Sequence, residues 1–528
     1  MRVLPVNLNT ILVELDDLAQ TLALLASLQS DPITGIKEIV PAARTLMISR
    51  TPAITDWSAL LQELSERCLD GVSQQSGRCV EIPVTYNGED LEYVANTAGI
   101  SIEEVIRRHT GSDHVVAFTG FAPGFAYLSG VDPILNMPRR LMPRPSLPAG
   151  SVALASGFSA VYPQTSPGGW QIIGSTNMPM WDLDRDPPSL LQPGDHVRFT
   201  AVNEQTSVIE QAPAKSALPQ TGPLQIRNSG LLSTFQDLGR FGQAKQGVSV
   251  SGAMDKASLA AANRMVGNAE TETCIETAYG RLELVCHSST EVSVAGAQCF
   301  IDITDSQNHV RQISAPASVT LNPGDCLKLS EPVAGVFSYL AVRGGFDVPH
   351  VLGSASTDFM AKIGRMLSTG DYLPVKTDVL TKPTRFTATP ISLPRKKEIT
   401  TLDVVMGPRT DWFSQESLDL FASQLWTVTA QSNRVGLRLS GDTPLVRSVE
   451  MEGKELASEG TVRGAIQVPA AGQPILFMAD HPLTGGYPVI ACVADYHLDF
   501  AGQLPIGAQI RFRPIRAFEA LELENPHG

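Results

Sequence analysis

The spacing of hydrophobic positions predicts helices and strands in alternation over the first part of the chain. Apolar residues recur at helical spacing across Ile11–Leu28, follow mainly a strand pattern across Ile36–Ile48, and return to helical spacing across Asp56–Cys68. We therefore expect residues 1–78 to form a small α+β domain.

Short β-strands dominate the next region. Cys79–Tyr86 has a strand-like pattern, Leu91–Ala98 has a helical one, and a capping-box pattern at Ser101 opens a second helix. Up to residue 200, short apolar runs are then separated by Gly and Pro, which is typical of a barrel or a sandwich. We expect residues 79–202 to form a β-barrel.

The principal boundary is expected at residues 203–222, which lack apolar periodicity and mix polar residues with Pro, Ala and Gly. Residues 223–528 contain a predicted helix at Met254–Val266 and many strand-like runs, which we interpret as two barrel-like subdomains. A turn followed by a strand recurs three times along the chain, starting at Pro193, Pro323 and Pro505. This recurrence indicates either related β units or a turn that precedes many unrelated strands.

Composition and charge narrow the class of protein. The chain has 528 residues, a net charge of −14 and 18% charged residues, which favours a soluble globular protein and argues against nucleic acid or an anionic membrane as a partner. Its seven cysteines never form a CxxC pattern, and the N-terminal residues do not resemble a signal peptide, so we expect a cytoplasmic location. The sequence also lacks a P-loop and the usual metal-binding spacings, and we predict no metal site.

The segment 118–175 combines Gly and Pro with buried-type aromatic residues, which favours a rigid pocket wall over a flexible linker. Two of its turns place backbone donors beside aromatic rings, so that they can hold a carboxylate or phosphate while a ring stacks on the ligand. The alternative is a pair of tight barrel turns with buried aromatic side chains. The substrate-binding candidates in these turns are Phe121, Pro123, Gly124, Phe125, Gly168, Gly169 and Trp170.

Arg139, Arg140 and Arg144 lie between the two turns, and guanidinium groups there would suit an acidic substrate. We take Arg139 and Arg144 as substrate-binding candidates, with exposure to solvent as the alternative. His109 lies at the end of a predicted helix, where it either complements the helix dipole or carries a proton in catalysis.

The second half offers polar residues beside glycines. Asp237 and Asp255 are candidate catalytic residues, although Asp255 also fits the first turn of the predicted helix. Candidate substrate-binding residues are Arg240, Arg409, Asp411, Gly485, Gly486 and Tyr487. A site shared between the first-half turns and either the GAMD or the TGGY segment of the second half is our sharpest hypothesis.

Several longer motifs give the chain a family resemblance. GFAPGFAYL, PRPSLPAGSVALA and YPQTSPGGWQIIG resemble allophanate hydrolase subunit one, the B subunit of bacterial 5-oxoprolinase. GLLSTFQDLGRFG, YLAVRGGFDVPHVLGSASTD and TGGYPVIA resemble subunit two, the C subunit. The resemblance covers nearly the whole chain and implies a fusion of two subunits, with cyclophilin-like β-barrels in tandem as in the carboxyltransferase region of urea amidolyase.

The resemblance implies three functions. The first is the B/C component of an ATP-dependent 5-oxoprolinase, which opens 5-oxoproline, a small acidic amide, to glutamate together with a separate A subunit. The second is the carboxyltransferase component of a biotin-dependent urea or amide carboxylase. The third is a regulator of a histidine kinase.

The chain departs from the family pattern at a few positions. Asn433 replaces an acidic residue, Arg463 stands where Pro is expected, and His481-Pro482 replaces a more polar pair before TGGYP. These departures concern the substrate more than the fold.

Overall fold

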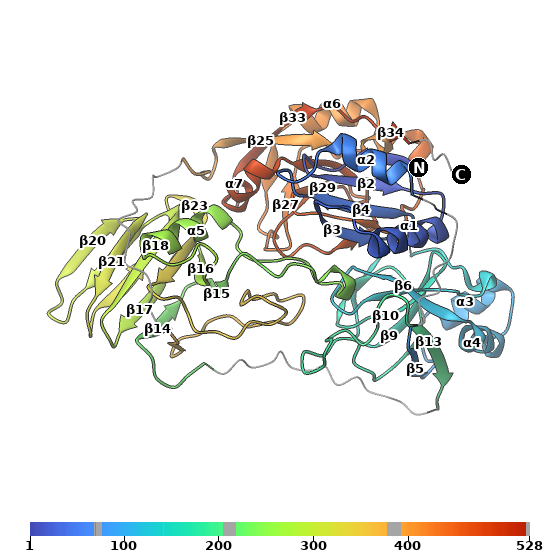
Figure 1. The fold of residues 1–528 in the computed structure, drawn as a ribbon, viewed down its shortest axis with the longest axis horizontal. Helices are drawn as coiled ribbons and strands as arrows, with labels where there is room; N and C mark the ends of the chain where they lie inside the picture. The colour runs from blue at the N-terminus through green and yellow to red at the C-terminus, as the bar shows by residue number, and fades with distance from the viewer. Residues whose placement is uncertain (68, 70–76, 141, 204–217, 377–391, 524–528) are drawn as a thin grey trace.

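The computed structural model describes residues 1–67, 69, 77–140, 142–203, 218–376 and 392–523. Four β-rich units follow one another along the chain, and we call them the N-terminal domain (residues 1–67), the first barrel (79–202), the sandwich (224–373) and the second barrel (399–516) (Figure 1). The prediction of a mainly β protein with barrels in tandem after a small α+β unit is confirmed. Most of the predicted linker, residues 204–217, and Cys68 lie outside the described residues.

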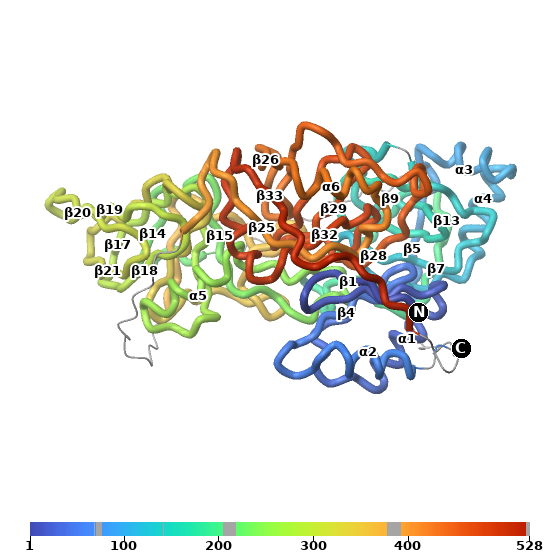
Figure 2. The backbone as a smooth tube through the Cα atoms, turned by 90° about the horizontal axis from the view of Figure 1, so that it is seen from above, coloured from blue at the N-terminus to red at the C-terminus, as the bar shows by residue number. Residues whose placement is uncertain are grey.

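The N-terminal domain is a five-stranded sheet with two helices on one face. The sheet has the order β3-β4-β2-β1-β34, and its last strand comes from the other end of the chain (Figure 2). Its elements are β1 (Arg2–Pro5), β2 (Thr10–Glu14), α1 (Leu18–Ser30), β3 (Ile36–Pro41), β4 (Thr45–Arg50), α2 (Trp57–Ser65) and β34 (Leu521–Glu522).

The helical prediction for Ile11–Leu28 is wrong in its first part, because Thr10–Glu14 forms β2 and the helix begins only at Leu18. Both faces of β2 are buried: Ile11 and Val13 pack toward the helices, whereas Leu12 packs toward the second barrel. A strand buried on both faces has a continuous apolar run, which periodicity cannot distinguish from a buried helix. The side chain of Asp17 then caps α1 by accepting from the backbone N–H of Gln20 at 2.9 Å.

The first barrel is a seven-stranded sheet of order β12-β9-β10-β7-β6-β13-β5. A bridge between Thr85 and Ser175, next to its two edge strands, brings it close to closure. Its elements are β5 (Cys79–Val84), α3 (Leu91–Ala98), α4 (Ile102–Gly111), β6 (His114–Thr119), β7 (Ala126–Ser129), η1 (Pro133–Leu135), β8 (Arg144–Leu147), β9 (Ser151–Ala155), β10 (Phe158–Val161), β11 (Ser166–Gly168), β12 (Gln171–Ser175) and β13 (His196–Ala201).

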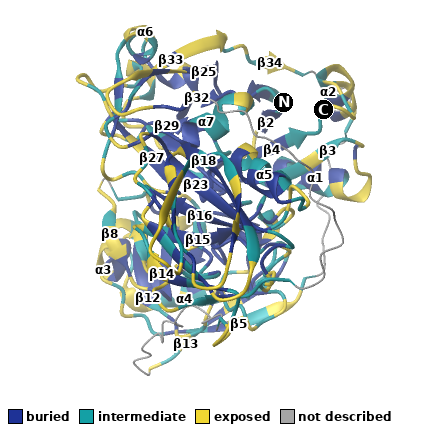
Figure 3. Ribbon diagram, turned by 90° about the vertical axis from the view of Figure 1, so that its left-hand side faces the viewer, coloured by how far each residue is buried: buried dark blue, intermediate teal, exposed yellow. Residues whose placement is uncertain are grey.

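The sandwich consists of two facing sheets, with orders β20-β19-β22-β17-β14-β24 and β15-β16-β23-β18-β21, and a buried apolar core between them. Figure 3 shows the buried strands of this unit and the more exposed helices at the rim of the molecule. The elements are β14 (Leu224–Ser229), β15 (Leu232–Gln236), η2 (Ala244–Gln246), α5 (Lys256–Met265), β16 (Cys274–Ala278), β17 (Leu282–Cys286), β18 (Thr290–Gln298), β19 (Phe300–Thr304), β20 (Val310–Ser314), β21 (Ala317–Leu321), β22 (Cys326–Leu329), β23 (Ala334–Val342) and β24 (Tyr372–Leu373).

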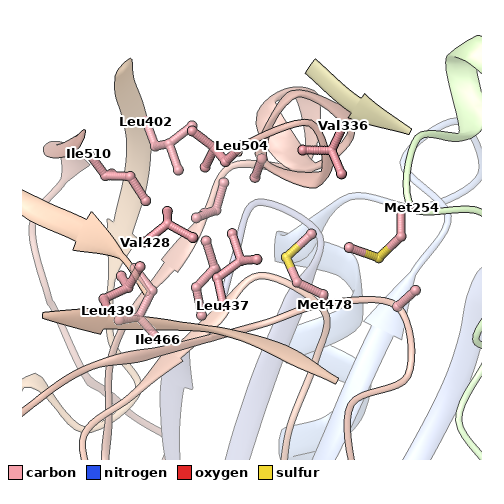
Figure 4. Packing of buried hydrophobic residues seen from close by; sticks show 14 of the residues in the cluster. Met254, Val336, Leu402, Val428, Leu437, Leu439, Ile466, Met478, Leu504 and Ile510 are labelled. Carbon is pink, nitrogen blue, oxygen red and sulfur yellow. The ribbon is translucent and has the colours of Figure 1, made fainter. Parts of the chain in front are cut away.

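The second barrel is closed, with the strand order β25-β32-β29-β30-β27-β26-β33. Its core continues into the sandwich, because Met254 and Val336 pack with barrel residues such as Met478 and Leu504 (Figure 4). The elements are β25 (Ile399–Met406), η3 (Thr410–Trp412), α6 (Gln415–Ser423), β26 (Trp426–Val428), β27 (Gly436–Ser440), η4 (Val449–Met451), β28 (Glu459–Gly460), β29 (Ala465–Gln467), β30 (Ile475–Phe477), β31 (Thr484–Gly485), β32 (Val489–Val493), η5 (Asp495–His497), α7 (Leu498–Gly502) and β33 (Gln509–Arg516).

The three turn-then-strand endings do not share one position in the fold. The strand after Pro193 is β13, which pairs in parallel with β5, the first strand of its barrel. The strand after Pro505 is β33, which pairs in parallel with β25 in the same way. The strand after Pro323 is β22, which has only antiparallel neighbours. Two of the three endings are therefore equivalent in topology.

Candidate functional site

The sheet of the first barrel separates two environments. On β7, Ala126 and Leu128 point to the face covered by α3 and α4, whereas Tyr127 points to the opposite face. The opposite face meets residues Ala42 and Ala43 of the N-terminal domain and carries most of the aromatic residues of segment 118–175. We call this aromatic surface the inner face.

The aromatic residues of the inner face form one connected cluster. The Phe125 ring lies 5.1 Å from that of Phe121, 5.3 Å from that of Tyr162 and 5.6 Å from that of Trp170, each in an edge-to-face arrangement. Phe121 adopts a left-handed backbone conformation, with φ at 61°. A bulky residue is strained in this conformation, and such strain persists where the surroundings hold the chain in a required shape.

The second barrel supplies the group that holds this turn. The backbone N–H of Phe121 donates to Thr484 Oγ1 at 2.9 Å, and Thr484 Oγ1 lies 3.5 Å from the Tyr127 hydroxyl. A side chain at Gly120 would collide with Thr484, so the two segments touch as closely as a glycine permits. The structure therefore brings the FAPGF and TGGY segments into contact, and a substrate site shared between them stays a prediction.

Arg139 extends this contact between the barrels. Its Nη2 donates to Ser458 Oγ at 3.2 Å, and its backbone N–H donates to Glu455 at 3.1 Å. Its Nη1 lies so close to Gly486 that any side chain there would displace the guanidinium. Its Nε atom is buried and has no hydrogen-bond partner among the described residues.

The remaining candidates of these turns have structural contacts. The backbone N–H of Gly124 donates to Gln246 O at 3.0 Å, and Gly169 O accepts from Arg140 at 2.7 Å. Gly168 packs against the Tyr162 hydroxyl, where a Cβ would collide. Pro123 lies in the same turn as Gly124, Gly485 packs against Gln467, and Tyr487 is 36% exposed.

Arg140 and Arg144 both bind Asp90, away from the second barrel. Arg144 donates to both carboxylate oxygens at 2.8 Å, and Arg140 donates to one of them at 2.8 Å. Asp90 also accepts from the backbone N–H of Ile172 at 2.7 Å, so its charge is well compensated. The guanidinium of Arg144 already binds the Asp90 carboxylate. Substrate binding by Arg144 stays a prediction.

His109 lies on the face of the sheet opposite the aromatic cluster. Its Nδ1 is 2.7 Å from the Tyr86 hydroxyl, its Nε2 is 2.9 Å from Ser159 Oγ, and its ring stacks on Phe199. Burial, and then the nearby His114, hold the pKa of His109 well below its usual value, so the ring is neutral. The structure therefore does not place His109 against the glycine-rich turns.

Asp255 caps a helix in a fully buried network. It accepts from the backbone N–H of Ser258 at 2.9 Å and from Gln503 Nε2 at 2.8 Å. Burial, and then the charge of Asp499, raise the pKa of Asp255. The GAMD segment thus joins the sandwich to the second barrel.

Arg434, which comes from the second barrel, is the centre of the same network. Its guanidinium binds Asp480 at 2.9 Å, Glu276 of the sandwich, and Gly252 O at 2.7 Å. Ser251 Oγ donates to Asp480 at 2.6 Å. This set of charges is paired and hydrogen-bonded throughout, as a buried ion network must be.

Asp237 and Arg240 form a second buried polar group in the sandwich. Asp237 accepts from the hydroxyls of Ser354 at 2.5 Å and Ser356 at 2.6 Å. Burial alone would raise the pKa of Asp237, but these hydrogen bonds lower it. Arg240 donates to the carbonyl of Ser356 and lies 3.4 Å from Asp358, while its Nε atom has no partner within the part of the chain that the structure describes.

Arg409 and Asp411 connect the second barrel to the N-terminal sheet. Arg409 donates to Glu459 at 2.9 Å and to Glu14 at 2.7 Å. Asp411 accepts from Arg2 at 2.7 Å. Both residues therefore have partners within the protein, and substrate binding by either residue stays a prediction.

The sequence did not single out Thr484 or Ser458 as candidates, although both contribute to the contact between the barrels. Thr484 precedes the two glycines of TGGY directly, so proximity to that motif was the available signal. Among the described residues, no group of three or more His, Cys, Asp or Glu side chains is placed to hold a metal ion. None of the helices in the described part of the chain is long and apolar enough to cross a membrane.

A comparison with known protein families shows which class of protein this chain belongs to. Residues 1–191 match the carboxyltransferase domain, subdomain C and D, and residues 246–514 match the carboxyltransferase domain, subdomain A and B. The chain therefore belongs to the carboxyltransferase-domain family and carries both of its halves.

Known proteins resemble each half separately. The C subunit of 5-oxoprolinase from Haemophilus influenzae is 34% identical over 55% of this chain and 91% of its own length. The B subunit from the same organism is 39% identical over 34% of this chain and 85% of its own length. The chain is thus consistent with a fusion of proteins that are separate in that organism.

Solved structures share this fold over nearly the whole chain or over part of it. The structure of a protein named TTHA0988 matches with a TM-score of 0.82 and 32% identity, covering 96% of this chain and 99% of that one. The urea carboxylase of Kluyveromyces lactis matches with a TM-score of 0.51 and 29% identity, over 57% of this chain and 28% of its own.

Proposed function

We propose that this chain is the combined B and C component of an ATP-dependent 5-oxoprolinase, which works with a separate A-type subunit in the cytoplasm. The observation that carries the proposal is that both halves of the chain have relatives named as subunits of that enzyme. The direct contact between Phe121 and Thr484 supports it, because it joins the half of the chain with B-type relatives to the half with C-type relatives.

Opening the lactam requires that amide resonance be broken. Phosphorylation of the lactam oxygen by ATP would release ADP and make the carbonyl carbon electrophilic. Attack by water would then break the ring C–N bond and leave an acyl phosphate, which a second water would hydrolyse to glutamate and inorganic phosphate. The enzyme must then hold the substrate carboxylate, the phosphate and the attacking water together. We assign carboxylate binding to Arg139, whose Nε donor is unused, and an apolar wall to the rings of Phe121, Phe125 and Trp170.

The three candidate catalytic residues, His109, Asp237 and Asp255, are buried within hydrogen-bond networks. We propose that they act by positioning the surrounding elements. Catalytic groups that touch the lactam would then come from the inner face or from the A-type subunit.

A carboxyltransferase is the second candidate, and the similarity to a urea carboxylase favours it. In that case the same contact between the barrels would receive a carboxyl group from carboxybiotin supplied by a partner. The acceptor would be an amide or urea nitrogen.

Reconstitution of the enzyme complex distinguishes the 5-oxoprolinase from the carboxyltransferase. The purified chain is mixed with an A-type subunit, ATP and 5-oxoproline, and the release of glutamate and ADP is measured against each component alone. Release that requires both proteins supports the proposal. Absence of release, together with carboxylation of urea in the presence of biotin carboxylase and a biotin carrier protein, would establish the alternative.

A further inference from the structure

Two lysine side chains from different parts of the fold lie against one exposed ring, and Arg463 acts electrostatically on one of these lysines. Lys37 comes from β3 of the N-terminal domain, Lys256 begins α5, and Arg463 lies just before β29 of the second barrel. The Phe241 ring is 50% exposed, with Lys37 Nζ 4.9 Å and Lys256 Nζ 5.5 Å from its centroid. We call this set the basic junction.

Lys256 and Arg463 donate mainly to backbone carbonyls, and Arg463 also forms an ion pair with Asp499 at 3.5 Å. Lys256 Nζ donates to the backbone carbonyl of Leu238 at 2.9 Å. Arg463 Nη2 donates to two backbone carbonyls, of Met254 at 2.6 Å and Leu498 at 3.1 Å. Among the described residues, the buried Nε atom of Arg463 has no hydrogen-bond partner.

The carboxylates around the junction also bind other groups, although Lys37 favours the charged forms of Asp495 and Glu38. Asp499 lies 3.5 Å from Arg463, but it accepts from the backbone N–H of Lys256 at 3.1 Å and of Ala257 at 3.0 Å, and it thereby occupies the start of α5. Asp495 accepts from Asn9 at 2.6 Å. Asp237 accepts hydrogen bonds from two serines. Burial raises the pKa of Glu38, which disfavours the charged form of its carboxyl group.

The charges of the junction repel one another. Burial, and then Arg463, lower the pKa of Lys256 to about 8. The pKa of His481 falls to about 4, mainly through burial, with Arg463 contributing. Like charges held together in a partly buried place raise the free energy of the folded protein unless an anion compensates them, and such arrangements are typical of functional sites.

We propose that Lys37, Lys256 and Arg463 form a binding site for a small oxyanion, either a carboxylate or a phosphate group. The oxyanion would accept from the two ammonium groups and from the free Nε of Arg463, beside the Phe241 ring. The site stands apart from the reaction proposed above and does not depend on it. Arg463 occupies a position where the family pattern has Pro, so the site distinguishes this chain from that pattern.

The test is calorimetric titration of the intact chain with inorganic phosphate and, separately, with 5-oxoproline. We expect saturable binding of at least one of them, weakened at least 10-fold by Lys256→Met and by Arg463→Gln. Lys245→Met is the matched control, because Lys245 is an exposed lysine on the neighbouring helix η2, and its binding should stay within twofold of the parent.

The two ligands identify the source of the anion. Binding of phosphate alone indicates a phosphoryl group, binding of 5-oxoproline alone indicates a carboxylate, and binding of both indicates a general oxyanion site. If Arg463→Gln does not fold, Lys37→Met in the N-terminal domain takes its place, with weakening of at least threefold expected. Absence of binding to the parent chain, or equal binding by the parent and the junction variants, would overturn the proposal.

Discussion

At the scale of single residues, buried charges hold the domains of this molecule together. Arg434 is 4% exposed and binds carboxylates from both the sandwich and the second barrel. Its removal would leave Glu276 and Asp480 buried without a counter-charge. Such residues contribute to assembly whether or not they touch a substrate.

Arg434→Met should therefore lower the free energy of unfolding by about 3–5 kcal/mol, the usual effect of breaking a buried ion pair on one side. Arg438→Met, on the same segment but exposed, should change it by less than about 0.5 kcal/mol. Urea denaturation followed by circular dichroism measures both. Equal effects of the two substitutions would show that the network does not stabilise the fold.

His481 gives stability a dependence on pH. Its ring is neutral when folded, with a pKa of about 4, because burial disfavours the charged form, whereas the unfolded chain takes up a proton near pH 6.5. The unfolded state thus binds more protons between these values, so stability rises with pH across this window and is lost as pH falls through it.

Urea denaturation at pH 7 and pH 5 should show a smaller loss of stability for His481→Gln than for the parent. His350→Gln, in which an exposed histidine is changed, should match the parent. A loss of the same size in His481→Gln and the parent would contradict the assignment of a neutral buried ring.

At the scale of elements, the sequence predicts the end of a helix where a capping residue fixes it. Ser101 accepts from the backbone N–H of Glu104 at 3.3 Å, as the capping-box pattern indicates. The residues that meet across domains were less predictable. Thr484 and Phe121 are 363 positions apart, and local patterns carry no information about which distant loops touch.

The same limit explains why the sequence predicted only part of the candidate site. The FAPGF and TGGY turns, which the sequence singled out by glycine beside an aromatic residue, do touch each other, because close backbone approach needs glycine. Substrate binding at these turns stays a prediction. For polar residues near glycines, such as Asp237 and Arg409, the sequence did not indicate which residues they bind. Asp237 binds two serines more than 110 residues away, and Arg409 binds glutamates on both sides of a domain boundary.

The cap of α5 tests the role of an element that joins two domains. Asp255→Ala should lower the free energy of unfolding by about 2 kcal/mol or more, at the upper end of cap substitutions, because it also frees Gln503. Asp56→Ala, at the exposed start of α2, should cost about 1 kcal/mol. Denaturant titration of both variants measures the difference, and a larger effect for Asp56→Ala would contradict it.

The contacts between the two halves extend over the whole molecule. The N-terminal sheet packs on the second barrel through an apolar layer and takes its last strand from the far end of the chain. The first barrel contacts the second at Thr484 and reaches the sandwich where Trp181 Nε1 donates to Ala361 O at 2.7 Å. The two halves therefore interlock at several places.

Residues 1–203 and 218–528, expressed together as separate chains, should associate into a 1:1 complex. Size-exclusion chromatography with light scattering measures the mass of this complex. Thr484→Asp should weaken the association, because a carboxylate would face the aromatic cluster, whereas Thr443→Asp at an exposed position should leave it unchanged. Separate elution of the two halves would contradict the interlocked arrangement.

The central claim is that the working site lies where the two barrels meet. Its most direct test is kcat/KM for 5-oxoproline in the reconstituted complex, compared between Arg139→Met and Arg140→Met. These adjacent arginines differ in surroundings, since Arg139 faces the second barrel and Arg140 binds Asp90. We expect a loss of about 100-fold for Arg139→Met, typical of removing a charged substrate contact, and less than about threefold for Arg140→Met. Equal losses, or a larger loss for Arg140→Met, would contradict the claim.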